Sequence, residues 1–421
     1  MRSKELLFIA TTGLLVACAD SPVAPARVAV DGPSLQQSEG RGVFQRYVAI
    51  GTSISMGVIG DGVFSGSQEN SWPAQLARLG NREITQPLIQ FPGCRSPYAA
   101  PLGGGVRLSG EPILTNPATL SCAPLEPGVT LPAQNVSLSG ARARDVLFTT
   151  PENILDAGNA KMYTRVLPPG MTQLDAMETQ NPKLVSVELG VNEVLQGISG
   201  IALVGAPPLP VENPATFAAQ MHQIFDRIDA VKVKHVLVVG LPTTPFNLPA
   251  FRTGAEIWAN AAAMLVAFNV AVQPDCNGVN AGNQIFVTAR LPIAIQAGLT
   301  ARAQNQPPVP LTCAGAGPTT QDFVLNAAEQ AILNGVVAQM NATIQAEAQA
   351  RGYAFLSLNA LYSAPGVRVP LNVVALMTSP TPFGPFMSLD GAHPSAAGQA
   401  LIAAAAAQAL NQRYDLGIPE P

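Results

Sequence analysis

The stretch Arg46-Tyr-Val-Ala-Ile-Gly51-Thr52-Ser53 decides the fold. It opens with a short apolar run and ends at a glycine that is followed by two hydroxyl side chains. Short apolar runs bounded by turn residues are typical of buried strands. We therefore expect a strand over residues 46–51 that delivers Thr52 and Ser53 to a turn.

Four further apolar runs predict strands, at residues 135–140, 184–190, 233–240 and 353–358. Longer stretches between and beyond them predict helices, at residues 72–79, 215–231, 255–272, 326–351 and 395–414. Strands that alternate with helices form a parallel sheet with helices on both faces. The expected fold class is thus α/β, a three-layer sandwich around a mostly parallel sheet of about five strands.

Three of these strands end at glycines, namely Gly51, Gly140 and Gly190. In open parallel sheets, ligands bind in a crevice beyond the carboxyl ends of the strands. We expect the three ends to line one such crevice.

Three segments rich in proline and glycine interrupt the alternation, at residues 100–132, 196–214 and 274–320. We expect loops there, around the crevice, where loops commonly set substrate choice. Because a domain typically contains roughly 150 residues, the length of the chain would suggest two or three domains. The candidate site residues described below lie near both ends of the folded stretch and must meet, so we expect one domain over residues 43–416.

The N-terminus carries a targeting pattern. Arg2 and Lys4 precede an apolar run that ends in Leu15-Val-Ala-Cys18. The run is too short for a bilayer span, which takes about 20 apolar residues. It resembles bacterial lipoprotein signals, which implies that residues 1–17 are removed and that acylated Cys18 holds the protein to a membrane. The alternative is an ordinary secretion signal with an incidental cysteine.

Ala19, rather than aspartate, follows Cys18. By the bacterial sorting rule nothing then holds the protein at the inner membrane, so we expect a lipid-anchored protein of the cell envelope, at the outer membrane if the cell has one. Residues 18–42 are rich in Pro, Ser, Ala and Gly without apolar periodicity. Such a composition cannot bury a core, and it predicts a flexible tether.

Charge excludes one class of partner. The net charge is −4, and only 12% of residues are charged, against about 25% in average proteins. No run or stripe of Lys and Arg with interleaved aromatics is present, so a nucleic-acid partner has no electrostatic support. The positive mean hydropathy fits alanine-rich helices, and also a surface that handles acyl groups.

Besides Cys18, the chain has four cysteines, namely Cys94, Cys122, Cys276 and Cys313. An even number in an exported protein favours disulfides. Of three possible pairings we prefer Cys94 with Cys122 and Cys276 with Cys313, because each would close an insertion. The competing reading, a metal site, lacks short cysteine spacings, and neither His222 nor His235 lies beside a cysteine, so we expect no metal.

The chain has only three histidines. His222 lies in an expected helix and His235 in an expected strand, so both are interpreted as structural. His393 differs, because it lies in a loop directly before the last helix, three residues after Asp390. In an Asp-x-x-His loop, the carboxylate can bond one ring nitrogen and leave the other facing a substrate.

Four motifs together resemble those of SGNH (GDSL-type) hydrolases. The segment Ile50-Gly-Thr-Ser-Ile-Ser-Met-Gly57 resembles their Gly-Asp-Ser block, and Gly140 resembles the glycine of their second block. Gly190-Val-Asn-Glu193 resembles their Gly-x-Asn-Asp block, and Asp390 to His393 resembles their final Asp-x-x-His. The blocks come in the family's order and cover nearly the whole folded chain. The resemblance implies a flavodoxin-like fold and a serine esterase or lipase.

The resemblance also implies the role of each residue. Ser53 would be the nucleophile, His393 the general base and Asp390 the group that orients it. The oxyanion hole would combine the backbone amides of Ser53 and Gly140 with the side-chain amide of Asn192. Neutral donors suit that task, and no metal or cofactor is implied.

Two positions depart from the family pattern. Thr52 stands where the family has aspartate, and Glu193 stands where it often has aspartate. We expect Thr52 to make a local turn bond through its hydroxyl and Glu193 to accept a bond near the following helix start.

The expected substrate is a carboxylic ester of a lipid or another acyl group, cleaved through an acyl-serine intermediate. One alternative is an esterase that removes O-acetyl groups from polysaccharides, although two Trp and six Tyr offer few aromatic platforms for sugars. A second alternative is a non-catalytic surface lipoprotein that keeps the fold for binding. The sequence predicts no oligomeric state.

Overall fold

The computed structural model describes residues 42–205 and 211–420. The expected signal peptide, Cys18 and all of the tether except residue 42 lie outside the described residues. One continuous cluster of buried side chains extends from Val43 to Ile418.

The central sheet has the strand order β1-β2-β5-β11, and every pairing is parallel. Its strands are β1 (Tyr47–Ile50), β2 (Leu184–Glu188), β5 (His235–Gly240) and β11 (Ala354–Ser357). Strands covered on both faces favour continuous runs of Val, Ile and Leu, as these are. Four of the five expected strands are therefore confirmed to within two residues at each end.

The fifth expected strand, at residues 135–140, pairs with β1 only through one parallel bridge, between Ala49 and Asn135. The side-chain amide of Gln173 donates to the carbonyls of Val136, at 2.8 Å, and of Gly51, at 3.0 Å. It thereby occupies a carbonyl that a longer ladder would use. The segment runs along the edge of β1 without becoming a regular strand.

With this edge segment counted second along the chain, the spatial order of the five extended segments is 2-1-3-4-5. This is the flavodoxin-like order, whose ligand crevice lies where the order reverses, at the carboxyl end of the first strand. The segments that follow β1, the edge segment and β2 therefore meet at one place.

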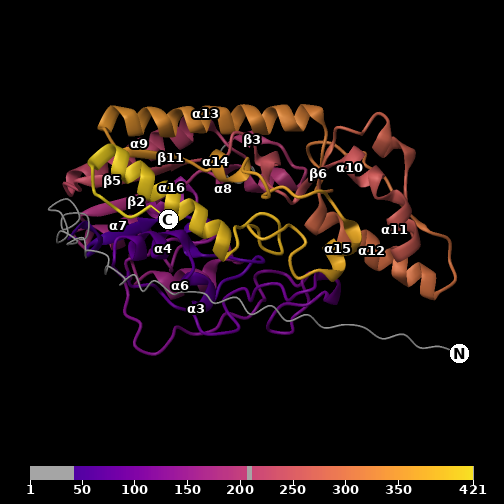
Figure 1. The fold of residues 1–421 in the computed structure, drawn as a ribbon, viewed down its shortest axis with the longest axis horizontal. Coiled ribbons are helices and arrows are strands. Elements are labelled where there is room, and N and C mark those ends of the chain that lie inside the picture. The colour runs from indigo at the N-terminus through magenta and orange to yellow at the C-terminus, as the bar shows by residue number, and fades with distance from the viewer. Residues whose placement is uncertain (1–41, 206–210, 421) are drawn as a thin grey trace, which may run out of the picture.

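Helices cover both faces of the sheet (Figure 1). On one face lie α4 (Trp72–Leu79) and α16 (Ala396–Tyr414). The other face is covered by α7 (Gln173–Glu178), α9 (Pro214–Ala230) and α13 (Ala327–Arg351), and α13 runs along the top in Figure 1. The expected three-layer α/β fold is confirmed.

Side-chain caps set where the long helices begin. The Asn213 side chain accepts from the second residue of α9, and Asn326 accepts from two amides at the start of α13. Ser395 does the same for α16. Each cap satisfies a backbone donor that has no partner within its helix. The helices expected at 215–231, 326–351 and 395–414 are found within one residue of these bounds.

The helix expected over residues 255–272 is wrong as a single element. It divides into α10 (Gly254–Ala259) and α11 (Ala261–Phe268). Asn269 ends α11 in the left-handed conformation, which asparagine tolerates. The rest becomes the short strand β7 (Val270–Val272), which pairs with β9 (Val309–Leu311).

The loop expected over residues 274–320 also needs correction, because it contains the 17-residue helix α12 (Val287–Ala303). Its buried face includes Leu291, Ile295 and Gly298. A Cβ on Gly298 would lie 2.3 Å from the carbonyl oxygen of Phe268, so glycine permits close packing on α11. In Figure 1, α10, α11, α12 and α15 (Val373–Thr378) extend the sandwich sideways.

The described residues of the other two insertions form short elements, namely η1 (Leu102–Gly104), η2 (Gln196–Ser199), β3 (Val204–Gly205) and β4 (Val211–Glu212). The remaining elements are α2 (Ser53–Met56), α3 (Ser65–Gln68), α5 (Ala143–Phe148), α6 (Ala160–Val166), α8 (Asn192–Leu195), η3 (Pro245–Asn247), β6 (Phe251–Thr253), η4 (Pro274–Asn277), β8 (Gln284–Phe286), β10 (Val324–Leu325) and α14 (Asn359–Tyr362).

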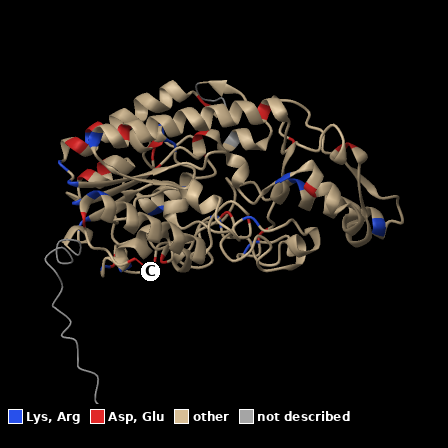
Figure 2. Cartoon of the chain, turned by 45° about the horizontal axis from the view of Figure 1, so that its top comes forward, with Lys and Arg blue, Asp and Glu red and all other residues tan. Residues whose placement is uncertain are grey.

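Both expected disulfides are present, joining Cys94 to Cys122 and Cys276 to Cys313. The first closes a largely irregular segment, and the second encloses the helix α12. Charged side chains are sparse over the whole ribbon (Figure 2). Within the described ranges, no helix is long and apolar enough to cross a membrane.

Candidate active site

Ser53 is the first residue of the short helix α2, directly beyond the carboxyl end of β1. The turn before it requires glycine, because a Cβ on Gly51 would lie 2.5 Å from Ser55 Oγ. Gly57 ends α2 with φ of +85°, a conformation that glycine adopts without strain. This tight strand-turn-helix unit holds the Ser53 hydroxyl at the sheet edge, in the crevice.

Ser53, His393 and Asp390 form one chain of hydrogen bonds. His393 Nε2 lies 2.8 Å from Ser53 Oγ, and His393 Nδ1 lies 2.7 Å from Asp390 Oδ2. Because the carboxylate can only accept, Nδ1 carries the proton and Nε2 is free to take one from the serine. The three residues singled out in the sequence are thus brought together in the geometry of a nucleophile, a base and an orienting group.

Asp390 is held by several donors besides the imidazole. The backbone amides of Ala392 and His393 donate to Oδ1 at 2.9 Å, and the amide of Asp61 donates to Oδ2 at 2.8 Å. The Ser388 hydroxyl adds a bond of 3.0 Å. These bonds fix the carboxylate, and through it the imidazole ring.

Burial disfavours the charged forms of both residues. For Asp390, burial raises the pKa, but the charge and hydrogen bonds of His393 outweigh it and hold the pKa well below the usual 3.8. For His393, burial lowers the pKa, but Asp390 outweighs it and places the pKa above the usual 6.5. Asp61 raises the pKa of His393 further, while Arg95 opposes it.

The donors proposed for the oxyanion hole lie around the same crevice. Neither the backbone amide of Ser53 nor that of Gly140 has an acceptor among the described residues. Gly140 has φ of +80°, which turns the chain after the edge segment. Asn192 begins α8 after β2, and its side-chain amide spends one hydrogen on the Ala141 carbonyl, at 2.8 Å, leaving the other available.

Thr52 does not make the local bond that we expected. Its backbone amide and its hydroxyl both donate to the carboxylate of Glu188 on β2, at 2.9–3.0 Å. Glu188 is buried and also accepts from the Ser55 hydroxyl, which in turn accepts from Trp72 Nε1. Burial raises the pKa of Glu188, and the bonds from Thr52 and Ser55 oppose that rise.

Sequence reasoning missed Glu188, the one acidic residue of β2, at the carboxyl end of that buried strand. It fixes the residues on both sides of Ser53 and ties the nucleophile turn to the strand that leads to Asn192. A carboxylate is thus present at the position of the nucleophile block, but it comes from the neighbouring strand rather than from residue 52.

This arrangement predicts a rescue. In Glu188→Gln, an amide group faces donors, and in Thr52→Asp a second carboxylate faces Glu188. We expect each change to lower kcat and to lower the free energy of unfolding by about 1–3 kcal/mol, the cost of an unsatisfied buried polar group. The double variant keeps one carboxylate and should regain kcat, with a coupling energy of about 1 kcal/mol or more. Urea unfolding measures the free energy of unfolding, and steady-state kinetics measures kcat. If the losses of the two single variants simply add in the double variant, residue 52 cannot replace the carboxylate of residue 188.

Glu193 accepts from the amide of Ala143 at 2.6 Å, at the start of α5. We expected an acceptor near the helix that follows Glu193, but the bond is made to the helix that follows Gly140. Burial raises the pKa of Glu193 to about 7. The residue therefore holds the Gly140 segment against α8.

An apolar pocket opens beside Ser53 and His393. Its volume is about 70 Å³, and its walls include Val191, Leu195, Leu241, Leu248 and Val337. Leu195 is 39% exposed, whereas Leu241 and Val337 are at most 3% exposed. The lining thus combines a partly exposed side chain of α8 with buried side chains, among them Val337 of α13.

The other two histidines lie away from this site. His222 is exposed on α9 and pairs with Glu347 and Asp226. His235 packs edge-on against Tyr414 at the start of β5. In the part of the chain that the structure describes, no cluster of His, Cys, Asp and Glu could hold a metal ion.

A protein family and a solved structure are similar to this chain. The sequence profile of the family described as GDSL-like Lipase/Acylhydrolase matches residues 47–406. No curated protein matches the chain. Among solved structures, the extracellular lipase from Streptomyces rimosus is similar, with 17% sequence identity and a TM-score of 0.32; the match covers 87% of this chain and 98% of the lipase.

The profile spans most of the chain, from β1 to within α16, and includes every element that contributes to the site. The chain therefore belongs to the GDSL-like lipase/acylhydrolase family and is a carboxylic ester hydrolase.

Proposed function

We propose that the protein cleaves esters of short acyl chains through an acyl-serine intermediate on Ser53. The observation that carries this proposal is the hydrogen-bonded chain from Ser53 through His393 to Asp390, beside an apolar pocket. Family membership sets aside the alternative of a non-catalytic lipoprotein.

In the first half of the reaction, Ser53 Oγ attacks the ester carbonyl while His393 Nε2 takes its proton. The amides of Ser53 and Gly140 and the side chain of Asn192 stabilise the oxyanion. The intermediate collapses, His393 returns the proton to the leaving alkoxide, and the alcohol departs. Water then attacks the acyl-serine with His393 as base, which releases the acid and restores the serine.

The pocket volume bears on the length of the acyl chain. Holding one water-sized group takes roughly 10–15 Å³ of such volume. A pocket of about 70 Å³ therefore accommodates on the order of five carbon atoms. Its apolar walls suit a hydrocarbon chain, and its small volume limits the length of that chain.

The test is a series of p-nitrophenyl esters from acetate to palmitate. We expect kcat/KM to peak at butyrate or hexanoate and to fall for longer chains. Cleavage of acetate alone would favour the O-acetyl esterase, and a maximum at palmitate would contradict the short pocket. Val337→Ala removes side-chain volume from the wall of the pocket and should move the maximum to a longer chain.

We also propose that the protein is held to the cell envelope by acyl groups on Cys18. The support is the signal-like sequence before Cys18 and the tether after it. In fractionated cells, the wild-type protein should sediment with membranes, and Cys18→Ser should appear in the soluble fraction. A wild-type protein found only in the soluble fraction would contradict the anchor.

A further inference from the structure

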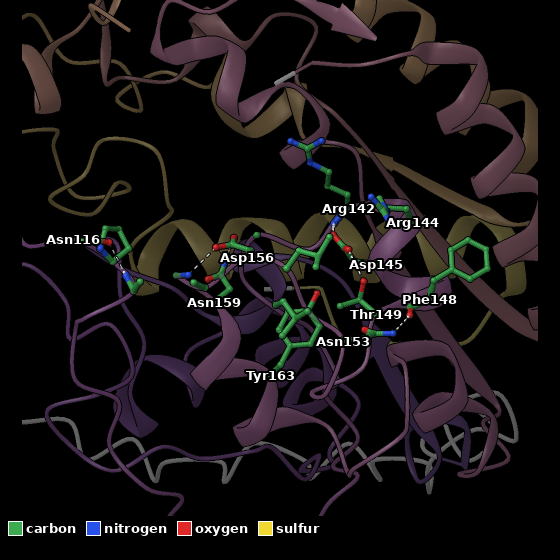
Figure 3. A pocket seen from close by; sticks show the side chains of 17 residues that line it. Asn116, Arg142, Arg144, Asp145, Phe148, Thr149, Asn153, Asp156, Asn159 and Tyr163 are labelled. Carbon is green, nitrogen blue, oxygen red and sulfur yellow. Dashed lines mark hydrogen bonds between the residues drawn. The ribbon is translucent and has the colours of Figure 1, made fainter. Parts of the chain in front are cut away.

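The segment that the first disulfide closes, residues 94–122, reaches two different places. One part of it belongs to the wall of a cleft of about 940 Å³, in which Asn116 lies at one side and Phe148 at the other (Figure 3). Neither the nucleophile nor the base nor its orienting carboxylate lines that cleft. Another part, which includes Arg95 and Arg107, instead contacts a turn that holds the orienting carboxylate.

This turn is formed by residues 59–62, shortly after α2. Its two end residues exchange backbone hydrogen bonds of 2.9 and 3.0 Å. Its central residues, Gly60 and Asp61, have φ of +50° and +60°, and positive φ at both positions is typical of a type I′ turn. Glycine and aspartate tolerate this conformation better than most residues do. The amides of the two central residues make no bond within the turn and are free to donate outward.

Both of these amides hold the carboxylate that orients the base. The Asp61 amide donates to Asp390 Oδ2 at 2.8 Å, and the same oxygen bonds His393 Nδ1. The Gly60 amide donates to the Ser388 hydroxyl at 3.0 Å, and this hydroxyl donates to Asp390 Oδ1 at 3.0 Å. The turn thus reaches both carboxylate oxygens, so its position sets the position of Asp390.

The side chain of Asp61 ties the turn to the insertion. Arg107 Nη2 donates to Asp61 Oδ2 at 2.8 Å, and Arg95 Nη2 lies 3.5 Å from Asp61 Oδ1. The Arg107 side chain is only 2% exposed, its Nη1 donates to the Ser96 carbonyl at 2.9 Å, and its guanidinium lies over the Tyr98 ring. Because a buried charge requires a partner, Arg107 and Asp61 hold each other in place.

The charges of this ion-pair cluster also act on the base. Burial lowers the pKa of His393, and the orienting carboxylate outweighs that effect. Asp61 raises the pKa of His393 further, whereas Arg95 lowers it. Tyr98 and Tyr362 lie near the same loop, and burial raises the pKa of both, so they stay neutral. Asp61 and Arg95 are therefore opposing influences on one imidazole.

We propose that Asp61 and Arg107 are positioning residues for the reaction, and that through this ion pair the insertion fixes the turn that holds Asp390. The inference rests on the proposed function, in which Asp390 orients His393. The insertion that we expected to set substrate choice thus contributes to the chemical step. Neither Asp61 nor Arg107 lines the apolar pocket, so their replacement should lower kcat rather than raise KM.

The first test separates the position of the turn from its charge. Asp61→Ala removes the anchor, so kcat should fall about ten- to a hundredfold, the effect of one hydrogen bond to a charged group. Asp61→Asn tolerates the same backbone conformation and can still accept from Arg107, so it should keep most of kcat. Arg107→Met keeps the packing on Tyr98 without the ion pair and should resemble Asp61→Ala. Steady-state kinetics with p-nitrophenyl butyrate measures kcat and KM.

The second test uses the pH profile of kcat/KM, which a loss of stability alone would not shift. Asp61→Asn removes a negative charge that favours the imidazolium of His393, so the acid limb should move to lower pH. Arg95→Met removes a positive charge that disfavours the imidazolium, so the limb should move to higher pH. The two shifts have opposite signs although both variants break the same ion pair.

Asp226→Asn is the matched control. Asp226 also pairs with an arginine, because Arg351 Nη2 lies 2.6 Å from its Oδ1. This pair lies where β11 begins, at the opposite end of the sheet from the crevice. We expect Asp226→Asn to keep the kcat and the acid limb of the wild type. Circular dichroism checks that each variant is folded.

Wild-type kcat in both Asp61→Ala and Arg107→Met would overturn the proposal. Acid limbs that stay in place, or that move in the same direction in Asp61→Asn and Arg95→Met, would overturn it as well. If the buried Arg107→Met variant does not fold, the two variants of the partly exposed Asp61 still decide the question. None of these results removes the proposed function, which fails instead if Asp390→Asn keeps wild-type kcat or if the wild type cleaves no ester.

Discussion

Replacing Ser53 by alanine is expected to lower kcat about a million-fold, the loss seen when a triad nucleophile is removed. The Ser53 hydroxyl lies 2.8 Å from the only imidazole in the site, and no other hydroxyl is placed there by β1 and α2. The residual rate would come from the oxyanion donors and from substrate binding alone. Steady-state kinetics with p-nitrophenyl butyrate measures the change.

Two comparisons sharpen this result. Ser363→Ala, at an exposed serine on the surface, should keep wild-type kcat. Adding His393→Ala to Ser53→Ala should lower kcat little further, because residues that act as one unit have non-additive effects. A Ser53→Ala variant with more than about a hundredth of wild-type kcat would contradict the assignment, as a much larger loss is expected.

Replacing Asp390 by asparagine is expected to lower kcat about ten-thousand-fold, because an amide favours the wrong tautomer of the base. The change is nearly isosteric, and the amides of Ala392 and His393 can still donate to the side-chain oxygen, whereas the amide of Asp61 loses its acceptor. Circular dichroism should therefore show a folded protein.

The same variant carries a prediction on pH. His393 must be neutral to take the serine proton, so activity falls as the pH drops through its pKa. In the wild type that pKa is raised, chiefly by Asp390 against the effect of burial, so the acid limb of kcat/KM should lie above pH 6.5. In Asp390→Asn the opposing burial remains, and the limb should move to lower pH. An unmoved limb would show that it belongs to another group.

Much of the site could be predicted because its residues follow strand ends. Gly51, Gly140 and Gly190 each close an apolar run, and parallel strands bring such ends to one edge. His393 was the easiest to find, since the chain has three histidines and the other two lie within regular elements. These inferences needed only local patterns and the order of elements.

Glu188 could not be found in this way. The bonds between Glu188 and Thr52 span 136 residues of sequence, and no local pattern specifies them. Two features of the sequence pointed to Glu188. An acidic side chain in a buried strand needs hydrogen-bond donors, and Thr52 stands where the family has aspartate.

Helix α12 shows a different limit. Its apolar residues Leu291 and Ile295 follow helical spacing, but Pro292 and the surrounding glycines indicate a loop. The helix forms because tertiary packing on α11 outweighs the cost of an interior proline, which is about 3 kcal/mol. The division of residues 255–272 has the same origin, since Val270–Val272 pair with β9, which lies far along the chain.

The most direct test of the central claim is the position of a covalent adduct. The purified protein is treated with a fluorophosphonate ester, digested, and mapped by mass spectrometry. We predict one adduct, on Ser53, formed as activity is lost and absent in Ser53→Ala. Full inactivation with the adduct on any other side chain, or an active enzyme that never forms one, would contradict the claim that Ser53 is the nucleophile.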